Sequence, residues 1–279
     1  MKEKLTIIKV GGKIVEEEAS LRQLLTDFSA IPGAKILVHG GGRSATKIAA
    51  QLGVETKMIG GRRVTDRQML DIVTMVYGGL VNKSVVARLQ AQGVNALGLT
   101  GADMNVIRSH KRPVKDVDYG FVGDVDEVDG EFLADLIRKG IVPVMAPLTH
   151  DGQGQLLNTN ADTIAGETAK AMARFFDVTL VYCFEKKGVL RNADDDESVI
   201  PHINEAEFKR YVEDGTIQGG MIPNWKTPSM PSTPEWQKWS SRWLRPSTAP
   251  PAPSSKNKKS PKIEKKQRVG VTFHPPARL

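Results

Sequence analysis

The amino-acid sequence predicts an α/β protein, a three-layer α/β/α sandwich built around a mainly parallel central sheet. Three observations support this fold class. Short apolar runs alternate along residues 1–223 with longer segments of helical periodicity. The runs are almost continuously apolar, which is typical of strands buried on both faces. Helical crossovers between consecutive runs favour parallel pairing, because parallel strands cannot be joined by tight turns.

Five apolar runs are expected to form the central sheet. In chain order they are residues 5–10 (LTIIKV), 35–40 (KILVHG), 96–101 (ALGLTG), 141–148 (IVPVMAPL) and 178–183 (VTLVYC). The segments LRQLLTDFSA and ADTIAGETAKAMA between them have helical patterns. Residues 106–128 instead alternate polar and apolar side chains and carry turn signals. This segment predicts a β-hairpin that could cover an acceptor site.

Composition restricts the class of protein. With 279 residues and 40% hydrophobic content, the chain can form one large α/β domain or two smaller ones. The single cysteine, Cys183, permits neither a disulfide framework nor a cysteine zinc site. No apolar run approaches the length of a membrane span, and the N-terminus enters a strand pattern without a signal peptide. We therefore expect a soluble cytoplasmic protein without membrane contact.

The net charge of +7 is concentrated near the C-terminus. From Asn224 onward the chain has 12 Lys and Arg against 2 Asp and Glu, whereas residues 1–223 have 27 against 30. The same stretch contains all four Trp and 10 of the 16 Pro. Position 224 is therefore predicted to separate an α/β body from a low-complexity basic tail.

Two glycine clusters close the first two predicted strands. The first is Lys9-Val10-Gly11-Gly12, and the second comprises residues 40–42, before a helix expected to start near Ser44. Glycines let backbone N–H groups approach a phosphate, and a helix N-terminus favours negative charge. An ordinary strand-to-helix turn is the simpler explanation for either cluster alone. The two together favour an anion site, although neither has a dinucleotide fingerprint or a Walker A sequence.

Two later motifs offer further polar groups. Residues 61–66 contain Arg63, whose planar guanidinium could clamp a carboxylate, whereas the adjacent Arg62 has the character of a surface arginine. Residues 158–162 (NTNAD) open the last predicted helix. One of these polar residues is explained as an N-cap. An aspartate near lysines at a phosphate site could instead hold those lysines in position.

The ordered set K-V-G-G, H-G-G-G, G-x-R-V-T and N-x-N-A-D resembles the acetylglutamate kinases, the arginine-pathway branch of the amino-acid kinase family, over residues 5–223. The resemblance implies ATP-dependent phosphorylation of the γ-carboxylate of N-acetyl-L-glutamate or another N-acyl-L-glutamate. It further implies a homodimer, and Mg²⁺ that arrives with ATP instead of occupying a dedicated protein metal site. A carboxylate nucleophile needs no general base, so positioning and charge neutralisation would do most of the work.

The resemblance also implies roles for individual residues. Lys9 would stabilise charge on the transferred phosphoryl group, and Asp162 would orient the catalytic lysines. The acylglutamate would be held by four residues: Gly41, Gly42, Arg63 and Asn158. The nucleotide would be held by three glycines: Gly11, Gly12 and Gly188. The strand before Gly188 ends in YCFEKKG where the family has a T-D-V-x-G-like turn, so no adenine contacts are assigned.

A second departure follows residues 219–223 (GGMIP), where the family continues with another catalytic lysine on a helix. Asn224 stands there, and Lys226 would face roughly 200° away on a helix. Read one nucleotide out of register, the codons from 224 restore (Lys/Glu/Gln)-Leu-Glu-(Asn/Asp) and later a strand-like run over residues 236–240. A single-base deletion near codon 224 therefore explains the tail better than a natural lineage-specific extension.

Three classes of function follow from these patterns. The favoured one is an active acylglutamate kinase, acting on an acetyl or a succinyl substrate. The alternative within the same fold is a kinase homologue that binds its ligands but is catalytically impaired by the altered C-terminus. The third is a nucleic-acid binder that uses WQKWSSRWLR for stacking and phosphate contacts. The acidic body gives that class no support, so no nucleic-acid partner is expected.

Overall fold

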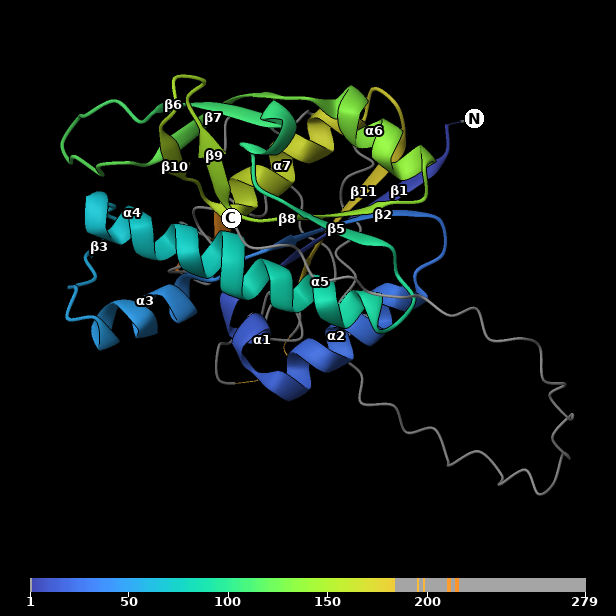
Figure 1. The fold of residues 1–279 in the computed structure, drawn as a ribbon, viewed down its shortest axis with the longest axis horizontal. Helices are drawn as coiled ribbons and strands as arrows, with labels where there is room; N and C mark the ends of the chain where they lie inside the picture. Colours follow the sequence, from blue (N-terminus) through green and yellow to red (C-terminus); the bar gives the residue numbers. More distant parts are fainter. Residues whose placement is uncertain (1, 184–194, 196–197, 199–209, 212–213, 216–279) are drawn as a thin grey trace, which may run out of the picture. The chain divides into compact units, whose positions relative to one another are not determined.

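The computed structural model describes residues 2–183 together with residues 195, 198, 210, 211, 214 and 215. Its centre is a five-stranded parallel sheet with the strand order β11-β1-β2-β8-β5 (Figure 1). The strands are β1 (Lys4–Val10), β2 (Ala34–His39), β5 (Ala96–Leu99), β8 (Val142–Met145) and β11 (Asp177–Cys183). Each of the five predicted runs contributes one of these strands, which confirms the sheet.

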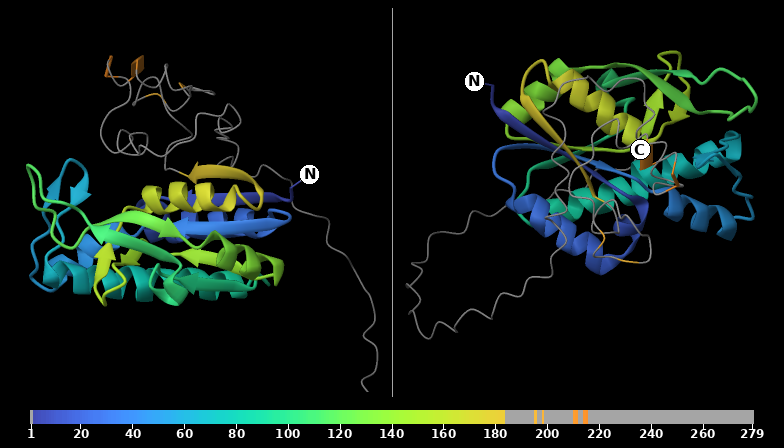
Figure 2. Two further views of the ribbon diagram at one scale, coloured as in Figure 1. Left: turned by 90° about the horizontal axis from the view of Figure 1, so that it is seen from above. Right: turned by 180° about the vertical axis from the view of Figure 1, so that it is seen from behind.

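Helices cover both faces of this sheet, so the predicted three-layer sandwich is confirmed. One layer contains α1 (Gly12–Glu16), α2 (Glu18–Ala30), α3 (Gly42–Gln51), α4 (Arg67–Val73), η1 (Thr74–Val81) and α5 (Asn82–Gln90). The other contains α6 (Gly130–Arg138) and α7 (Ala161–Met172). Figures 1 and 2 show α6 and α7 on one side of the strands and α2 and α5 on the other.

The two hydrophobic cores follow the strand period of two. In β1, Ile8 and Val10 pack with the layer that contains α2 and α5, whereas Leu5 and Ile7 pack with α6 and α7. Burial on both faces explains why these runs lack polar alternation. The run 141–148 divides after Met145, and its last residue begins β9 (Leu148–His150) of a second sheet.

The second sheet has the strand order β10-β9-β6-β7. The predicted hairpin is confirmed as β6 (Ile107–Lys111) and β7 (Gly123–Val128), paired antiparallel with an irregularity between Arg108 and Ser109. The remaining short elements are β3 (Met58–Ile59), β4 (Arg62–Arg63), η2 (Asp103–Asn105) and β10 (Leu156–Asn158). The hairpin joins this sheet through β9, and Val122, just before β7, forms an isolated bridge with Asn158 at the end of β10.

The elements α4, η1 and α5 form one helical run, Arg67–Gln90, with a π-helical middle. Within the described residues this helix is long and apolar enough to cross a membrane, which the sequence analysis did not anticipate. Half of its most apolar window is buried inside the protein. The π-helical turns carry the buried Tyr77, and such irregularities are common near functional sites.

Candidate active site

The two glycine clusters meet at the carboxyl ends of β1 and β2. These strands pair in parallel with Val10 opposite His39, and the Gly40 N–H donates to the Val10 carbonyl oxygen at 2.9 Å. A Cβ atom on Gly12 would lie 3.5 Å from the Gly42 nitrogen and 3.7 Å from the Gly41 nitrogen. These are ordinary van der Waals distances, so the backbones of the two turns lie close to each other. The sequence prediction that both clusters belong to one site is consistent with this geometry.

The helix after the second cluster begins earlier than the sequence suggested. We expected its start near Ser44, whereas α3 begins at Gly42 with Gly41 as its N-cap. No side chain caps this end. The first N–H groups of a helix have no partner within the helix, and the helix dipole is positive there. The N-terminus of α3 therefore presents backbone donors beside Gly12, as an anion site needs.

Lys9 and Asp162 form a buried ion pair across two elements. Lys9 is the penultimate residue of β1, Asp162 lies in the first turn of α7, and Nζ is 2.7 Å from Oδ1. The two side chains are only 9% and 12% exposed. A carboxylate is needed there because a buried ammonium without a partner is costly. Tyr182 lies opposite Lys9 on β11, and burial together with the charge of Asp162 raises the pKa of its phenol.

The N-cap of α7 is Asn160. Its side-chain oxygen accepts from the N–H groups of Asp162 at 2.7 Å and Thr163 at 3.3 Å. One polar residue of the NTNAD motif therefore serves as the cap, as the sequence analysis proposed. Asn158 and Asp162 are left for other interactions.

Arg63 is a buried cation at the second glycine cluster. Nη2 donates to the Gly42 carbonyl oxygen at 2.7 Å and to Thr46 Oγ1 at 2.8 Å, and Nη1 donates to Thr56 Oγ1 at 3.2 Å. Arg63 as a whole residue is 8% exposed. Among the described residues, no carboxylate forms an ion pair with it. A buried guanidinium bonded only to neutral acceptors suits an anionic ligand.

Asn158 is tied to Arg63 through Thr65. The Asn158 amide nitrogen Nδ2 donates to Thr65 Oγ1 at 2.9 Å, and this hydroxyl donates to the Arg63 carbonyl oxygen at 3.2 Å. The segment between β6 and β7 joins the same group, because the Phe121 N–H donates to the Thr65 carbonyl oxygen at 2.7 Å and the Asn158 N–H donates to the Phe121 carbonyl oxygen at 2.9 Å. The hairpin therefore lies directly beside two of the expected acceptor residues.

Tyr77 belongs to the site and had no signal in the sequence. A Cβ atom on Gly41 would lie 2.7 Å from the Tyr77 ring, and one on Gly42 would lie 4.0 Å from the phenol oxygen. Burial raises the pKa of Tyr77, while the charge and hydrogen bond of Arg63 act in the opposite direction. In an apolar helix, a tyrosine is indistinguishable from a core residue until the tertiary contacts are known.

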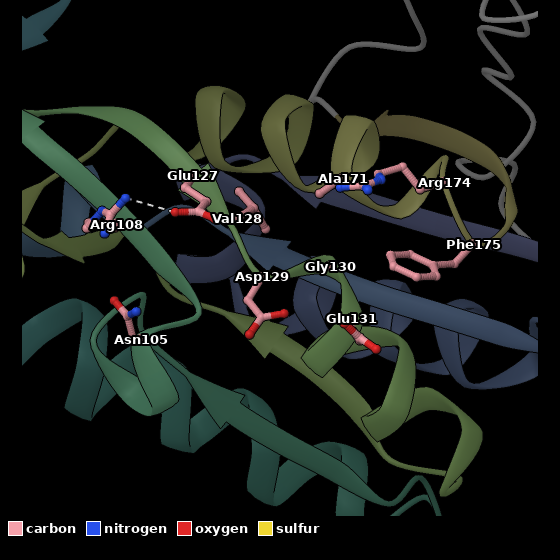
Figure 3. Close-up of a pocket in the computed structure, with 10 residues that line it drawn as sticks. All are labelled: Asn105, Arg108, Glu127, Val128, Asp129, Gly130, Glu131, Ala171, Arg174 and Phe175. Carbon is pink, nitrogen blue, oxygen red and sulfur yellow. Dashed lines mark hydrogen bonds and ion pairs between the residues drawn. The ribbon is translucent and has the colours of Figure 1, made fainter.

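A hollow of about 320 Å³ lies at the other end of α7, near Ala171 and Arg174 (Figure 3). Three of its charged residues are engaged with other groups of the protein. Arg108 pairs with Glu127 at 2.9 Å, and Asp129 accepts from the Phe132 N–H as the N-cap of α6. Because α7 has 12 residues and rises about 1.5 Å per residue, this hollow is distant from Asp162.

Comparison with known proteins decides the family. The family model described as "Amino acid kinase family" matches residues 4–229. The chain belongs to the amino-acid kinase family. The sequence is 78% identical over 223 residues to the acetylglutamate kinase of Bacteroides fragilis, covering 80% of this chain and 85% of the relative. It is 38% identical over 230 residues to the acetylglutamate kinase of Methanopyrus kandleri, covering 81% and 89%.

Solved structures share this fold. The smu.665 protein of Streptococcus mutans matches with a TM-score of 0.68 and 27% identity, over 78% of this chain and 86% of that protein. An N-acetylglutamate synthase from Neisseria gonorrhoeae matches with a TM-score of 0.64 and 21% identity, over 77% of this chain and 48% of that one. The second likeness concerns the fold alone.

The structure of this amino-acid kinase brings most of the predicted site residues together. Gly12 meets Gly41 and Gly42, which contact Arg63 and Tyr77. Gly11 follows β1 and donates its N–H to the Cys183 carbonyl oxygen at 3.2 Å. Gly188 lies outside the described residues, as do residues 219–223 and the tail from 224. Among the described residues, no group of three or more His, Cys, Asp or Glu could hold a metal ion.

The contact between Gly41 and Tyr77 generates a stability prediction. We expect Gly41→Ala to lower the free energy of unfolding by about 1–3 kcal/mol, because the added methyl group overlaps a buried ring. Gly166→Ala, within α7, is the matched control, since no heavy atom lies within 4 Å of its Cβ position and alanine favours a helix. Urea denaturation measures the free energy of unfolding of both variants. Equal unfolding midpoints for the two variants would contradict the packing argument.

Proposed function

We propose that this chain catalyses ATP-dependent phosphorylation of the γ-carboxylate of N-acetyl-L-glutamate. Relatives named acetylglutamate kinase, at identities up to 78%, support the reaction. The observation that carries the proposal is Arg63, a buried cation that touches only neutral acceptors among the described residues and lies beside the converging glycine turns. An acceptor with two carboxylates suits a site that combines this guanidinium with the backbone donors of α3.

The acceptor would lie between the glycine turn and the hairpin. Arg63 and Asn158 would hold the α-carboxylate end, and the N–H groups of Gly41 and Gly42 would hold the γ-carboxylate. That carboxylate is ionised at neutral pH, so it attacks the phosphoryl group without a general base. Orientation by fixed donors then supplies much of the rate acceleration.

The phosphoryl group would contact the Lys9 ammonium during its transfer. The lysine ammonium would neutralise charge that spreads over the transferred oxygens, and Asp162 would hold Nζ in place at 2.7 Å. Gly11 and Gly12 would admit the ATP phosphates close to the backbone, with Gly188 on the nucleotide side. Mg²⁺ would enter bound to the ATP phosphates, its common mode in phosphoryl transfer.

A coupled assay of ADP formation with N-acetyl-L-glutamate, and with N-succinyl-L-glutamate for comparison, tests this proposal. We expect Lys9→Met to lower kcat by about 10²–10³-fold, as for loss of one preorganised donor to the transition state.

We expect Arg63→Gln to raise the acylglutamate KM with little change in the ATP KM, because the lost contact is made to the acceptor. Arg62→Gln is the matched control, since strand alternation points the neighbouring side chain away.

Turnover that is insensitive to Lys9→Met, or an Arg63→Gln variant with altered ATP affinity and normal acylglutamate affinity, would contradict the assigned roles. Absence of binding of either acylglutamate to the unsubstituted chain, measured by calorimetry, would contradict the proposed substrate.

We further propose that residues 1–223 form the kinase domain and that residues 224–279 are a frameshifted basic tail. The Bacteroides fragilis relative matches over 223 residues and the family model ends at residue 229, so similarity stops near the composition boundary. Resequencing is the direct test. An in-frame AAC at codon 224 in an undamaged genomic copy would contradict the frameshift.

The tail proposal also predicts a kinetic difference. A frame-restored chain regains the second lysine implied by the resemblance, so we expect its kcat to exceed that of the chain with Asn224 by about 10²–10³-fold. The frame-restored chain and the chain with Asn224 should bind the acylglutamate with dissociation constants that agree within a few-fold, because the acceptor residues precede position 224. Equal kcat values would show that the tail replaces nothing needed for catalysis.

Finally, we propose a homodimer that uses the outer face of η1. Met75 and Leu80 are 56% and 55% exposed, and Gly79 beside them has no neighbouring atom within 4 Å of its Cβ position. In a π-helix, residues five apart lie about one turn apart, so the two side chains share a face. Leu80→Glu should shift the sedimentation of the protein toward monomer, whereas Leu52→Glu, at the C-cap of α3 and 59% exposed, should not.

A further inference from the structure

A buried histidine and a buried asparagine lie directly behind the second glycine turn. His39 ends β2 and is 0% exposed, and Asn82 begins α5 and is 1% exposed. The Asn82 amide nitrogen Nδ2 lies 3.1 Å from His39 Nε2 and 3.0 Å from the Val144 carbonyl oxygen. His39 Nδ1 lies 2.8 Å from the Gly40 carbonyl oxygen. The chain of contacts thus runs from β8 through Asn82 and His39 to the glycine turn.

These contacts select one tautomer of His39. The Val144 carbonyl can only accept, so the group of Asn82 that faces it must be the NH₂ group. The second N–H of that group then donates to His39 Nε2, which must be unprotonated. The ring proton is therefore on Nδ1, where it donates to the Gly40 carbonyl oxygen. Burial and the charge of Lys83 lower the pKa of His39 to about 4, so the ring is neutral at pH 7.

The orientation of the Gly40 carbonyl determines that of the Gly41 N–H. The two groups belong to one planar trans peptide, in which C=O and N–H point in opposite directions. A carbonyl oxygen held by His39 on the protein side therefore turns the Gly41 N–H away from His39. The Gly41 nitrogen lies 3.7 Å from the Cβ position of Gly12, in the region where the glycine turns meet.

We infer that His39 and Asn82 are positioning residues that fix the Gly40–Gly41 peptide so that the Gly41 N–H points into the acceptor site. The inference rests on the proposed function, since it takes the acceptor to be an acylglutamate carboxylate. Neither residue touches the acceptor. Asn82 selects the tautomer, His39 holds the carbonyl, and the peptide plane transmits the orientation to the N–H donor.

Two substitutions of His39 separate this role from simple core packing. In His39→Asn, the side-chain NH₂ group takes the place of Nδ1–H and can still donate to the Gly40 carbonyl oxygen. In His39→Gln, the amide group reaches the position of Nε2 and the Nδ1 donor is lost. Both variants disturb the buried ring, so both should unfold at lower urea concentration than the unsubstituted chain. Only His39→Asn keeps the hydrogen bond to the Gly40 carbonyl oxygen.

Calorimetric titration of the full chain with N-acetyl-L-glutamate measures the difference. We expect the dissociation constant to rise about tenfold in His39→Gln and in Asn82→Leu, and to stay within about threefold in His39→Asn. The affinity for a non-hydrolysable ATP analogue should not change in any of them. Equal acylglutamate affinities in His39→Asn and His39→Gln would overturn the positioning role, because a purely structural role weakens both alike.

A measurement on the unsubstituted chain covers the case in which a variant does not fold. The chain has five histidines, so the ring signals of His39 can be assigned from folded variants in which one of the five is replaced. Ring ¹⁵N NMR of the unsubstituted chain should then show His39 as the neutral Nδ1–H tautomer at pH 7. An Nε2–H tautomer or a charged ring would overturn the inference. If no acylglutamate binds to the unsubstituted chain, the proposed substrate is wrong. The Nδ1–H tautomer and a Gly41 amide shift that differs between His39→Asn and His39→Gln would then still support the positioning of the peptide.

Discussion

The site depends on the parallel register of β1 and β2. Val10 lies opposite His39, and the Gly40 N–H donates to the Val10 carbonyl oxygen, so the two glycine turns that follow these strands must lie against each other. A shift of one residue would exchange the faces of every side chain in β1 and move Lys9 away from α7. The register is secured by burial on both faces of the sheet, where Ile7 and Ile8 belong to different cores.

The protein carries two buried cations at this place and compensates their charges differently. Lys9 has the carboxylate of Asp162 at 2.7 Å, which holds a flexible side chain in one position and offsets much of its desolvation cost. Arg63 has hydrogen bonds to a carbonyl oxygen and two hydroxyl groups. These partners orient the guanidinium without cancelling its charge. Among the described residues, the charge of Lys9 is therefore paired with a carboxylate, whereas that of Arg63 is available to an anionic ligand.

The glycine turn is supported by buried side chains of other elements. Tyr77 packs against Gly41, and the His39 and Asn82 pair connects Gly40 to β8. A turn made of glycines has little conformational preference of its own, so its geometry must be imposed by surrounding side chains. The π-helical middle of the long helix carries Tyr77, which packs against this turn, and Asn82 follows it as the first residue of α5.

The sequence by itself determined the five strands, the hairpin, the two glycine turns and the presence of a helix N-cap within NTNAD. These features leave local signals, namely apolar runs, turn residues and capping residues. Only the tertiary structure decided that Gly12 lies against Gly41, that α3 starts at Gly42, and that Tyr77, His39 and Asn82 support the turn. Contacts between residues distant in the chain have no periodicity of their own, and a tyrosine or asparagine in an apolar helix looks the same whether it faces a core or a site.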